Sequence, residues 1–425
     1  MSLGKIPDQW KSAVISPLFK KGSSSNPANY RPVSLTSVFC KLMERVITEQ
    51  MLHYLRINKL ITKHQHGFLK GRCTATIYKL ERYGITGCLL RFIADFLTGR
   101  TQCTRVGNCM SPILPIMSGV VQGSCLGPVL FLLFINDLSD LFSGRVSIKM
   151  YADDIKLYTN LSMSDDPHTE FQTHLNMVAQ WAKEWQLPIA HAKCCAMKIG
   201  KTNRIGCPLH LEDKIISEVN QCMDLGLMVD NTLQFTNHID KMVVKAHRCA
   251  NLILRCFQSR NRDSLLAGFK AYVRSTVEYN SVVWSPHLIK DIEAVEKVQR
   301  RFTKRLPGLS NLTYCQRLAK LNIDSLELRR IRADLIFMYK IVFGILDLDC
   351  EDFVVLRKGD NTRGHHFKLY LPTCKHNARY NFFSHRTARI WNRLPLETGD
   401  FNSLPRFKKC LNSSMLVPFC KVNFF

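Results

Sequence analysis

The chain has 425 residues, of which 46% are hydrophobic and 22% charged, so it is no disordered tail and has enough apolar residues for two or three domains. Its 59 lysines and arginines outnumber 34 aspartates and glutamates, which gives a formal charge of +25 at pH 7. This charge favours polyanionic partners and argues against a small metabolic enzyme with an acidic surface. Charge alone leaves open a solvated basic surface or an anionic membrane face.

The positive charge is unevenly distributed along the chain. Residues 1–240 contain 26 lysines and arginines against 19 acidic residues, a net charge of +7, whereas residues 241–425 contain 33 against 15, a net charge of +18. The second part is therefore expected to contribute more to any contact with a polyanion.

The 17 cysteines are scattered and form no Cys-x-x-Cys pair, so nothing supports a zinc ribbon. The odd number and the lack of a signal peptide at Met1 to Trp10 indicate reduced thiols inside the cell. The longest apolar run, Val129 to Ile135, is far too short to span a membrane. We expect an intracellular protein, in the nucleus or the cytoplasm, with no membrane partner.

Hydrophobic periodicity predicts the following elements in chain order. Strands are expected at 13–19, 190–199 and 221–228, and helices at 37–58, 89–97, 127–141 and 171–185. A polar loop is expected at 20–29. Residues 239–344 are predicted to be helical and basic, with breaks at Pro286 and Pro307. The residues after Cys350 are expected to be loop-rich, with aromatic and arginine clusters.

Residues 146–159 alternate apolar and polar side chains on both sides of Ala152-Asp153-Asp154, which predicts a hairpin with carboxylates at its tip. Adjacent carboxylates repel each other unless a cation lies between them. Mg²⁺ prefers such oxygen ligands, and two-metal sites use shared carboxylates in phosphoryl transfer. Taken in isolation, the four residues Tyr151 to Asp154 also fit an ordinary aspartate-rich turn.

A glycine-rich stretch, Ser118 to Pro128, precedes this hairpin and runs directly into the apolar segment 129–138. Glycines let a backbone approach a nucleotide closely, and a helix start offers free N–H groups to a phosphate. A single glycine-rich stretch is a weak signal. This one is long, contains Gln122 and lies upstream of the paired carboxylates, which favours a nucleotide site.

Four motifs in this order resemble the reverse transcriptases of non-LTR (LINE-type) retrotransposons, particularly the jockey-like group. They are Asn29 to Leu35, Gln65 to Phe68, Ser118 to Pro128 and Tyr151 to Asp154. The segments 181–193, 224–226 and 386–395 extend the resemblance over nearly the whole chain. It implies an α+β right-hand polymerase: fingers and palm with an antiparallel sheet at 1–235, a basic helical thumb-like region at 236–345, and a C-terminal extension of unassigned function at 346–425.

The resemblance also implies the roles of individual residues. Asp153 and Asp154 match the catalytic pair that binds Mg²⁺. The residues that match nucleotide-binding or template-binding positions are Lys20, Lys21, Arg31, Gly119, Gln122, Gly123, Tyr151 and Lys193. For each lysine taken alone, a solvated surface position is the commoner explanation.

One family element has no room in this chain. The family places a strand with its first catalytic aspartate, and then a helix, between the motifs that match Gln65 to Phe68 and Lys79 to Ile85. Here only residues 73–80 separate Arg72 from Glu81, and a strand with its crossover helix needs about a dozen residues or more. Glu81 is the only acid in 73–94, and Asp95 lies in a segment that resembles a later helix. We expect exposed strand edges and weak or absent binding of catalytic Mg²⁺.

The leading interpretation is therefore an RNA-directed DNA polymerase by descent, with RNA template, DNA primer and deoxynucleoside triphosphates as partners. The alternative is a non-catalytic remnant that binds nucleic acid by backbone charge. A third interpretation is that an exon or frame between Arg72 and Glu81 is missing from the sequence. Nucleotide cyclases also have paired aspartates, but they lack the glycine-rich segment at this spacing. With no endonuclease ahead of the polymerase motifs, this chain alone is not expected to nick target DNA.

Overall fold

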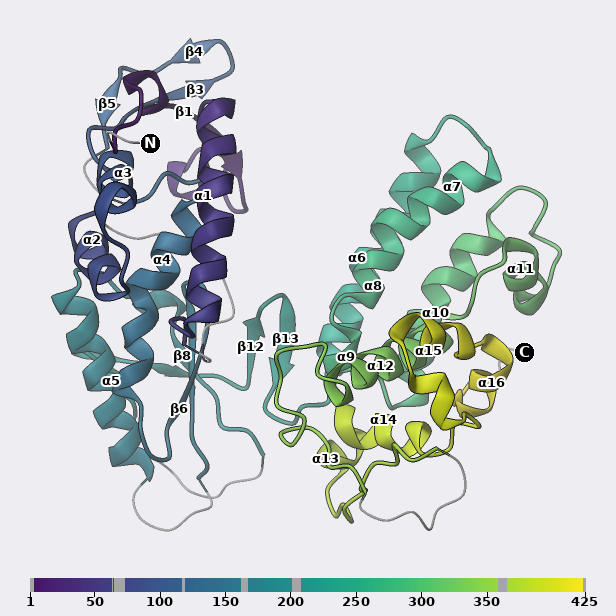
Figure 1. Ribbon diagram of the computed structural model, residues 1–425. Coiled ribbons are helices and arrows are strands. Elements are labelled where there is room, and N and C mark those ends of the chain that lie inside the picture. Colours follow the sequence, from purple (N-terminus) through teal and green to yellow (C-terminus); the bar gives the residue numbers. More distant parts are fainter. Residues whose placement is uncertain are drawn as a thin grey trace. The chain divides into compact units, whose positions relative to one another are not determined.

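The computed structural model describes residues 4–62, 64, 73–116, 119–161, 167–200, 208–357 and 365–422 (Figure 1). The chain divides into two compact units: the first comprises residues 1–194 and 204–217, and the second 195–203 and 218–425. Both helices and strands are present, in agreement with the α+β class. The bounds of these units differ from those of the expected segments 1–235, 236–345 and 346–425. The assignment of fingers and palm, thumb-like region and C-terminal extension to these segments stays a prediction.

The first unit contains a five-stranded sheet. Its central strand β1 (Ser12–Phe19) confirms the strand expected at 13–19 and pairs antiparallel with β2 (Tyr30–Leu35) and parallel with β3 (Thr101–Val106). Ala13 and Ile15 on β1 are buried, so one face of this strand enters the core. The strand β3 also pairs with two short strands, β4 (Cys109–Met110) and β5 (Leu114–Pro115).

The described residues of the first unit form the α-helices α1 (Val38–Ile57), α2 (Cys73–Arg82), α3 (Gly87–Leu97), α4 (Gly127–Ile135) and α5 (Pro167–Glu184). The helices expected at 37–58, 89–97 and 171–185 are confirmed. The helix expected at 127–141 is α-helical only to Ile135 and continues as a 3-10 helix, Asn136–Leu141. The Asn136 side chain, which accepts from the Thr62 amide and donates to Leu60 O and Tyr83 Oη, lies at this change.

The helix α4 is apolar on nearly every side, which is typical of a helix inside a core. Eight of its nine residues are buried. Val129, Leu130 and Leu133 pack with residues of α1, α2 and α3, whereas Phe131, Phe134 and Ile135 pack with α5 and with β6 (Ser147–Tyr151). Figure 1 shows α4 beside α1 and α2 and above β6 in the first unit. This helix therefore connects the glycine-rich segment before it to the hairpin that follows it.

Two strand predictions are wrong. The segment 190–199 forms a 3-10 helix, His191–Lys193, and only a two-residue strand, β8 (Cys195–Ala196), which pairs with β11 (Ser217–Glu218). The segment 221–228 is a hairpin of β12 (Gln221–Asp224) and β13 (Leu227–Asp230) instead of one strand. Leu225 and Gly226 both have positive φ, 45° and 84°, the backbone of a tight two-residue turn that Gly226 facilitates. Another short pair, β9 (His210–Leu211) with β10 (Lys214–Ile215), belongs to the first unit.

The second unit is mainly helical and has two apolar clusters. The first cluster consists of buried residues between Leu227 and Leu326, and the second of buried residues between Leu328 and Leu416. Pro286 and Pro307 lie between helices, as expected. The helices are α6 (Thr236–Cys256), α7 (Arg262–Gly268), a π-helix (Phe269–Arg274), α8 (Ser275–Glu278), α9 (Ser281–Trp284), α10 (Ile289–Lys304), α11 (Tyr314–Leu321) and α12 (Leu326–Val342).

The segment after Cys350 is only partly loop-rich. The described residues before 377 are irregular apart from one bridge, Leu356 to Leu369. The rest is largely helical, with α13 (Asn377–Asn381), α14 (Phe383–Trp391), α15 (Leu404–Cys410) and α16 (Ser413–Leu416). The expected arginine motif lies on α14, where Arg386 pairs with the buried Asp334 of α12 at 2.9 Å and donates to Val282 O. A search of the described residues finds no helix with the length and apolarity needed to cross a bilayer.

Candidate functional site

The paired carboxylates lie at the tip of the hairpin that β6 forms with β7 (Asp154–Tyr158), which confirms the predicted hairpin. Tyr151 pairs with Asp154, so Ala152 and Asp153 make the turn. Ala152 is 3% exposed and has a φ of 61°, a left-handed conformation that costs an alanine roughly 1–2 kcal/mol. Such strain is concentrated at functional sites. Asp153 and Asp154 are exposed, as is Tyr151.

Buried side chains anchor this hairpin on the first unit. Ile148 and Met150, one face of β6, are 1% exposed and pack with α4 and α5. Among the described strands, β6 and β7 pair only with each other. The amide of Met150 also donates to His64 O at 2.7 Å. Ile155 and Tyr158 on β7 remain 41% and 47% exposed.

The residues next to the expected position of the first catalytic aspartate are only partly described. Residues 73–82 form α2, while residues 65–72 with the Gln65 to Phe68 motif lie outside the described residues. Asp95 on α3 accepts from the Ile6 amide and from Lys11 Nζ, both at 2.7 Å. Burial alone would raise the pKa of Asp95, but these two hydrogen bonds hold it below its usual range. Asp95 is therefore a structural ion-pair partner.

The donor set at the hairpin fits a two-metal centre incompletely. Asp153 and Asp154 supply the hard oxygens that Mg²⁺ prefers. Within the described ranges, however, no three His, Cys, Asp or Glu side chains are grouped so that they could hold a metal ion. The Mg²⁺ site therefore stays a prediction for Asp153 and Asp154.

The glycine-rich segment lies against the strand that carries the Asn29 to Leu35 motif. The Ser34 amide donates to Gln122 O at 2.8 Å. Gly123 has a φ of 111°, and a Cβ atom there would lie 2.9 Å from Ser34 O, so only glycine fits. Gly119 also has positive φ, 89°, whereas Ser118 lies outside the described residues. The structure thus brings two of the predicted motifs into direct contact.

Glu44 holds the end of the same glycine-rich segment and was missed in the sequence analysis. Its fully buried carboxylate accepts from the amides of Cys125 and Leu126, at 2.6 and 3.1 Å, just before α4 begins. Burial and a hydrogen bond to Glu44 raise the pKa of Cys40 to about 12. A signal was present in the sequence: Glu44 shares the 3.6-residue spacing of Cys40, Ile47 and Met51, which form the buried face of α1.

Three predicted cations gather at one hairpin. Arg31 on β2 lies opposite Leu18 on β1, and the Lys20 amide donates to Asn29 O, which continues the ladder toward the turn. Lys20, Lys21 and Arg31 are all exposed at this end of the sheet. Lys193 is exposed too, on the short 3-10 helix after α5. Because Lys20, Lys21 and Arg31 are exposed, an anionic ligand could reach their side chains. The roles of all four residues stay predictions.

Lys79 is a second residue whose importance the sequence analysis missed. Its ammonium on α2 is almost fully buried and donates to Phe134 O and to Asp137 Oδ1, at 2.5 and 2.6 Å. It lies 3.6 Å from the centre of the Trp185 ring. Burial lowers the pKa of Lys79, although the ion pair with Asp137 opposes that shift. The buried ammonium therefore links α2 to the C-terminal end of α4 and to the 3-10 helix that follows it.

Comparisons with known proteins identify what the chain resembles. Residues 75–229 match the family described as reverse transcriptase (RNA-dependent DNA polymerase). A probable RNA-directed DNA polymerase from transposon X-element of Drosophila melanogaster is 23% identical over 347 residues. The RNA-directed DNA polymerases from mobile element jockey are 27% identical over 285 residues in Drosophila melanogaster and 26% over 358 residues in Drosophila funebris.

The comparisons extend over most of this chain and a smaller part of each relative. They cover 71%, 56% and 72% of this chain, and 38%, 31% and 39% of the three relatives. The chain thus spans less than two fifths of the length of these curated relatives.

Proposed function

We propose that this chain, which is related to the reverse transcriptases of jockey-like non-LTR retrotransposons, is an RNA-directed DNA polymerase by descent. Its substrates would be an RNA template, a DNA primer and deoxynucleoside triphosphates. The single observation that supports this best is the exposed Asp153–Asp154 pair on a strained turn, anchored to the helix that follows the glycine-rich segment. That arrangement suits a site where charged substrates meet a fixed pair of carboxylates.

Each residue would contribute by ordinary physical chemistry. Asp153 and Asp154 would hold Mg²⁺, which supplies charge stabilisation to the attacking and leaving oxygens of phosphoryl transfer. Gly119, Gln122 and Gly123 would let the backbone approach the nucleotide and template, and Tyr151 would pack beside the primer terminus. Lys20, Lys21, Arg31 and Lys193 would donate to phosphate oxygens of the template or the triphosphate. All of these are exposed or half-buried where their side chains are described.

We further propose that nucleotide incorporation is impaired. Two-metal phosphoryl transfer uses carboxylates that both ions share, and among the described residues the hairpin turn offers the pair Asp153 and Asp154 without a third metal-binding side chain beside it. Two observations support the defect: residues 73–82 are helical, and Asp95 is already paired with Lys11. A single carboxylate source would hold Mg²⁺ weakly, since each ligand lost leaves more of the ion's charge uncompensated.

A non-catalytic nucleic-acid-binding protein is the second candidate function. The net charge of +18 over residues 241–425 favours it, because basic residues bind phosphate backbones without any catalytic group. The two candidates agree on the ligand and differ on the reaction. Binding and incorporation must therefore be measured separately.

The test is primer extension on an RNA template with Mg²⁺ and labelled deoxynucleotides, with Asp153→Ala as the matched variant. Binding of the same primed template is measured in parallel by fluorescence anisotropy. We expect binding in both proteins and equal, background incorporation. Incorporation that disappears in Asp153→Ala would show that the site is active and would refute the defect. A chain that binds no primed template at all would refute both candidate functions.

A further inference from the structure

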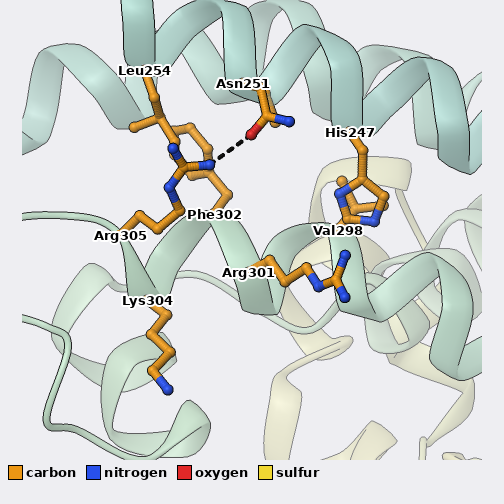
Figure 2. A pocket seen from close by; sticks show the side chains of 9 residues that line it. His247, Asn251, Leu254, Val298, Arg301, Phe302, Lys304 and Arg305 are labelled. Carbon is orange, nitrogen blue, oxygen red and sulfur yellow. Dashed lines mark hydrogen bonds between the residues drawn. The ribbon is translucent and has the colours of Figure 1, made fainter.

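A groove between α6 and α10 lies in the second unit, and none of the residues that line it has a role in the proposed function. It encloses about 340 Å³ (Figure 2). Its floor is apolar: Ala250 and Leu254 come from α6 and Val298 and Phe302 from α10, each at most 5% exposed. Arg301, Lys304 and Arg305 are exposed around this floor.

The rim is positively charged. Its ionisable side chains are His247, Arg301, Lys304 and Arg305, and none of the nine residues that line the groove is acidic. Positively charged side chains around one groove repel each other, and an anion in the groove reduces that repulsion. The rim of the groove therefore favours a negatively charged occupant.

Two of the arginines are oriented toward the groove. Arg305 donates to Asn251 Oδ1 at 2.6 Å, which directs its guanidinium across the groove to α6. Figure 2 shows the guanidinium of Arg301 turned toward the His247 ring, while Lys304 extends away from the other side chains. Burial, together with the charges of Arg301 and Lys297, lowers the pKa of His247, so its ring is neutral at pH 7 and can donate one N–H.

From this geometry we propose that the groove binds a phosphodiester of the nucleic-acid backbone, with Arg301 and Arg305 as its donors. Guanidinium groups match phosphate oxygens in pairs, and the apolar floor offers a surface for the adjoining sugar. A second hollow on α6 is lined by Asp240, Lys241, Val244, Lys245 and Arg248, so three basic residues against one acidic residue extend the positive surface along the same helix. A continuous strand of phosphates fits such a row better than a small anion does. The inference rests on the proposed nucleic-acid function and names one site that serves it.

The experiment measures binding of a fluorescein-labelled RNA–DNA hybrid of about 20 base pairs by the full chain, from 50 to 300 mM salt. The test variant is Arg301→Gln with Arg305→Gln. The control is Lys290→Gln with Lys320→Gln, which removes two exposed charges of the same unit that do not line the groove. Each lost phosphate contact reduces the slope of log K against log salt by about one. Because both arginines bind the same phosphodiester, we expect a slope lower by about one in the test variant and an unchanged slope in the control.

A third variant neutralises the charge of Arg305 and leaves both arginine side chains in place. Asn251→Asp would neutralise Arg305 in place, and we expect it to weaken hybrid binding about tenfold at 100 mM salt. Thermal denaturation of each variant checks that the fold is retained.

Equal losses in the test and control variants would overturn the site. So would poly-glutamate that binds more weakly to the test variant while hybrid binding is unchanged, because the groove would then accept an acidic peptide. If the unaltered chain binds no hybrid, the proposed function falls with the groove. If it binds and the Arg301–Arg305 variant binds equally well, only the groove falls.

Discussion

Lys79 and Glu44 show how single buried charges build the first unit around the candidate site. Lys79 joins α2 to α4, and Glu44 joins α1 to the start of α4. Neither was predicted, because their partners lie 55 to 82 residues away in the chain and a local pattern does not reveal them. Asp153 and Asp154 could be predicted because the hairpin signal surrounds them in the sequence. The local spacing thus predicted the hairpin that carries the two aspartates, whereas it could not predict long-range pairs.

The buried ion pair of Lys79 leads to a stability prediction. Lys79→Met keeps the length of the side chain but leaves Asp137 unpaired, and we expect the free energy of unfolding of the first unit to fall by about 2 kcal/mol. The control is Arg45→Met, since Arg45 pairs with Glu49 on the exposed face of α1, with side chains 74% and 64% exposed. That change should cost about 0.5 kcal/mol or less. Equal midpoints for both variants in urea denaturation would contradict this account of Lys79.

His365 leads to a pH prediction for the second unit. Its ring is fully buried beside Phe401, and burial with the nearby charges of Lys368 and His366 lowers its pKa to about 4. The unfolded chain, with a histidine pKa near 6.5, binds this proton more readily, so the stability from neutral His365 is present above pH 6.5 and is lost as the pH falls toward 4.

Between pH 7 and pH 5 this loss amounts to about 2 kcal/mol. In His365→Asn, which cannot titrate, we expect the free energy of unfolding to vary with pH by that much less. Urea denaturation of both proteins at the two pH values measures the difference. Identical pH dependence would mean that His365 is protonated equally readily in the folded and unfolded chain.

At the scale of elements, the glycine-rich segment contacts β2, which carries the Asn29 to Leu35 motif. Periodicity predicted most helices and β1, because α1, α3 and α5 each carry a clear apolar face. It did not predict that Gly123 packs against Ser34, since a positive φ at a glycine depends on what approaches it. The β12–β13 hairpin was missed for a related reason. Its turn has positive φ at Leu225 as well as at Gly226, and leucine has no preference for that conformation.

Gly123→Ala tests the contact between the glycine-rich segment and β2. The added Cβ would strain a φ of 111° and press on Ser34 O, so we expect a loss of about 2 kcal/mol in the free energy of unfolding. Gly107→Ala is the control: Gly107 also has positive φ, 59°, but nothing lies within 4 Å of its Cβ position. It should cost about 1 kcal/mol or less. Thermal denaturation separates the two, and equal losses would show that backbone strain alone, without contact with β2, explains the effect.

At the scale of the whole molecule, composition and motif order predicted the α+β class and the family relationship, and charge predicted the more basic second part. The bounds of the two compact units were not predicted, because the chain crosses between them three times, after residues 194, 203 and 217. The proposed incorporation defect rests on a gap in the order of the sequence motifs. It is the central claim, and it concerns what the chain lacks between Arg72 and Glu81.

Restoring the missing element tests this claim most directly. A strand and helix with the first catalytic aspartate, taken from a jockey reverse transcriptase, are inserted between Arg72 and Cys73, and primer extension on an RNA template is measured with Mg²⁺. The account predicts incorporation that depends on both the inserted aspartate and Asp153, and background incorporation by the unaltered chain. Incorporation by the unaltered chain that Asp153→Ala abolishes would contradict it.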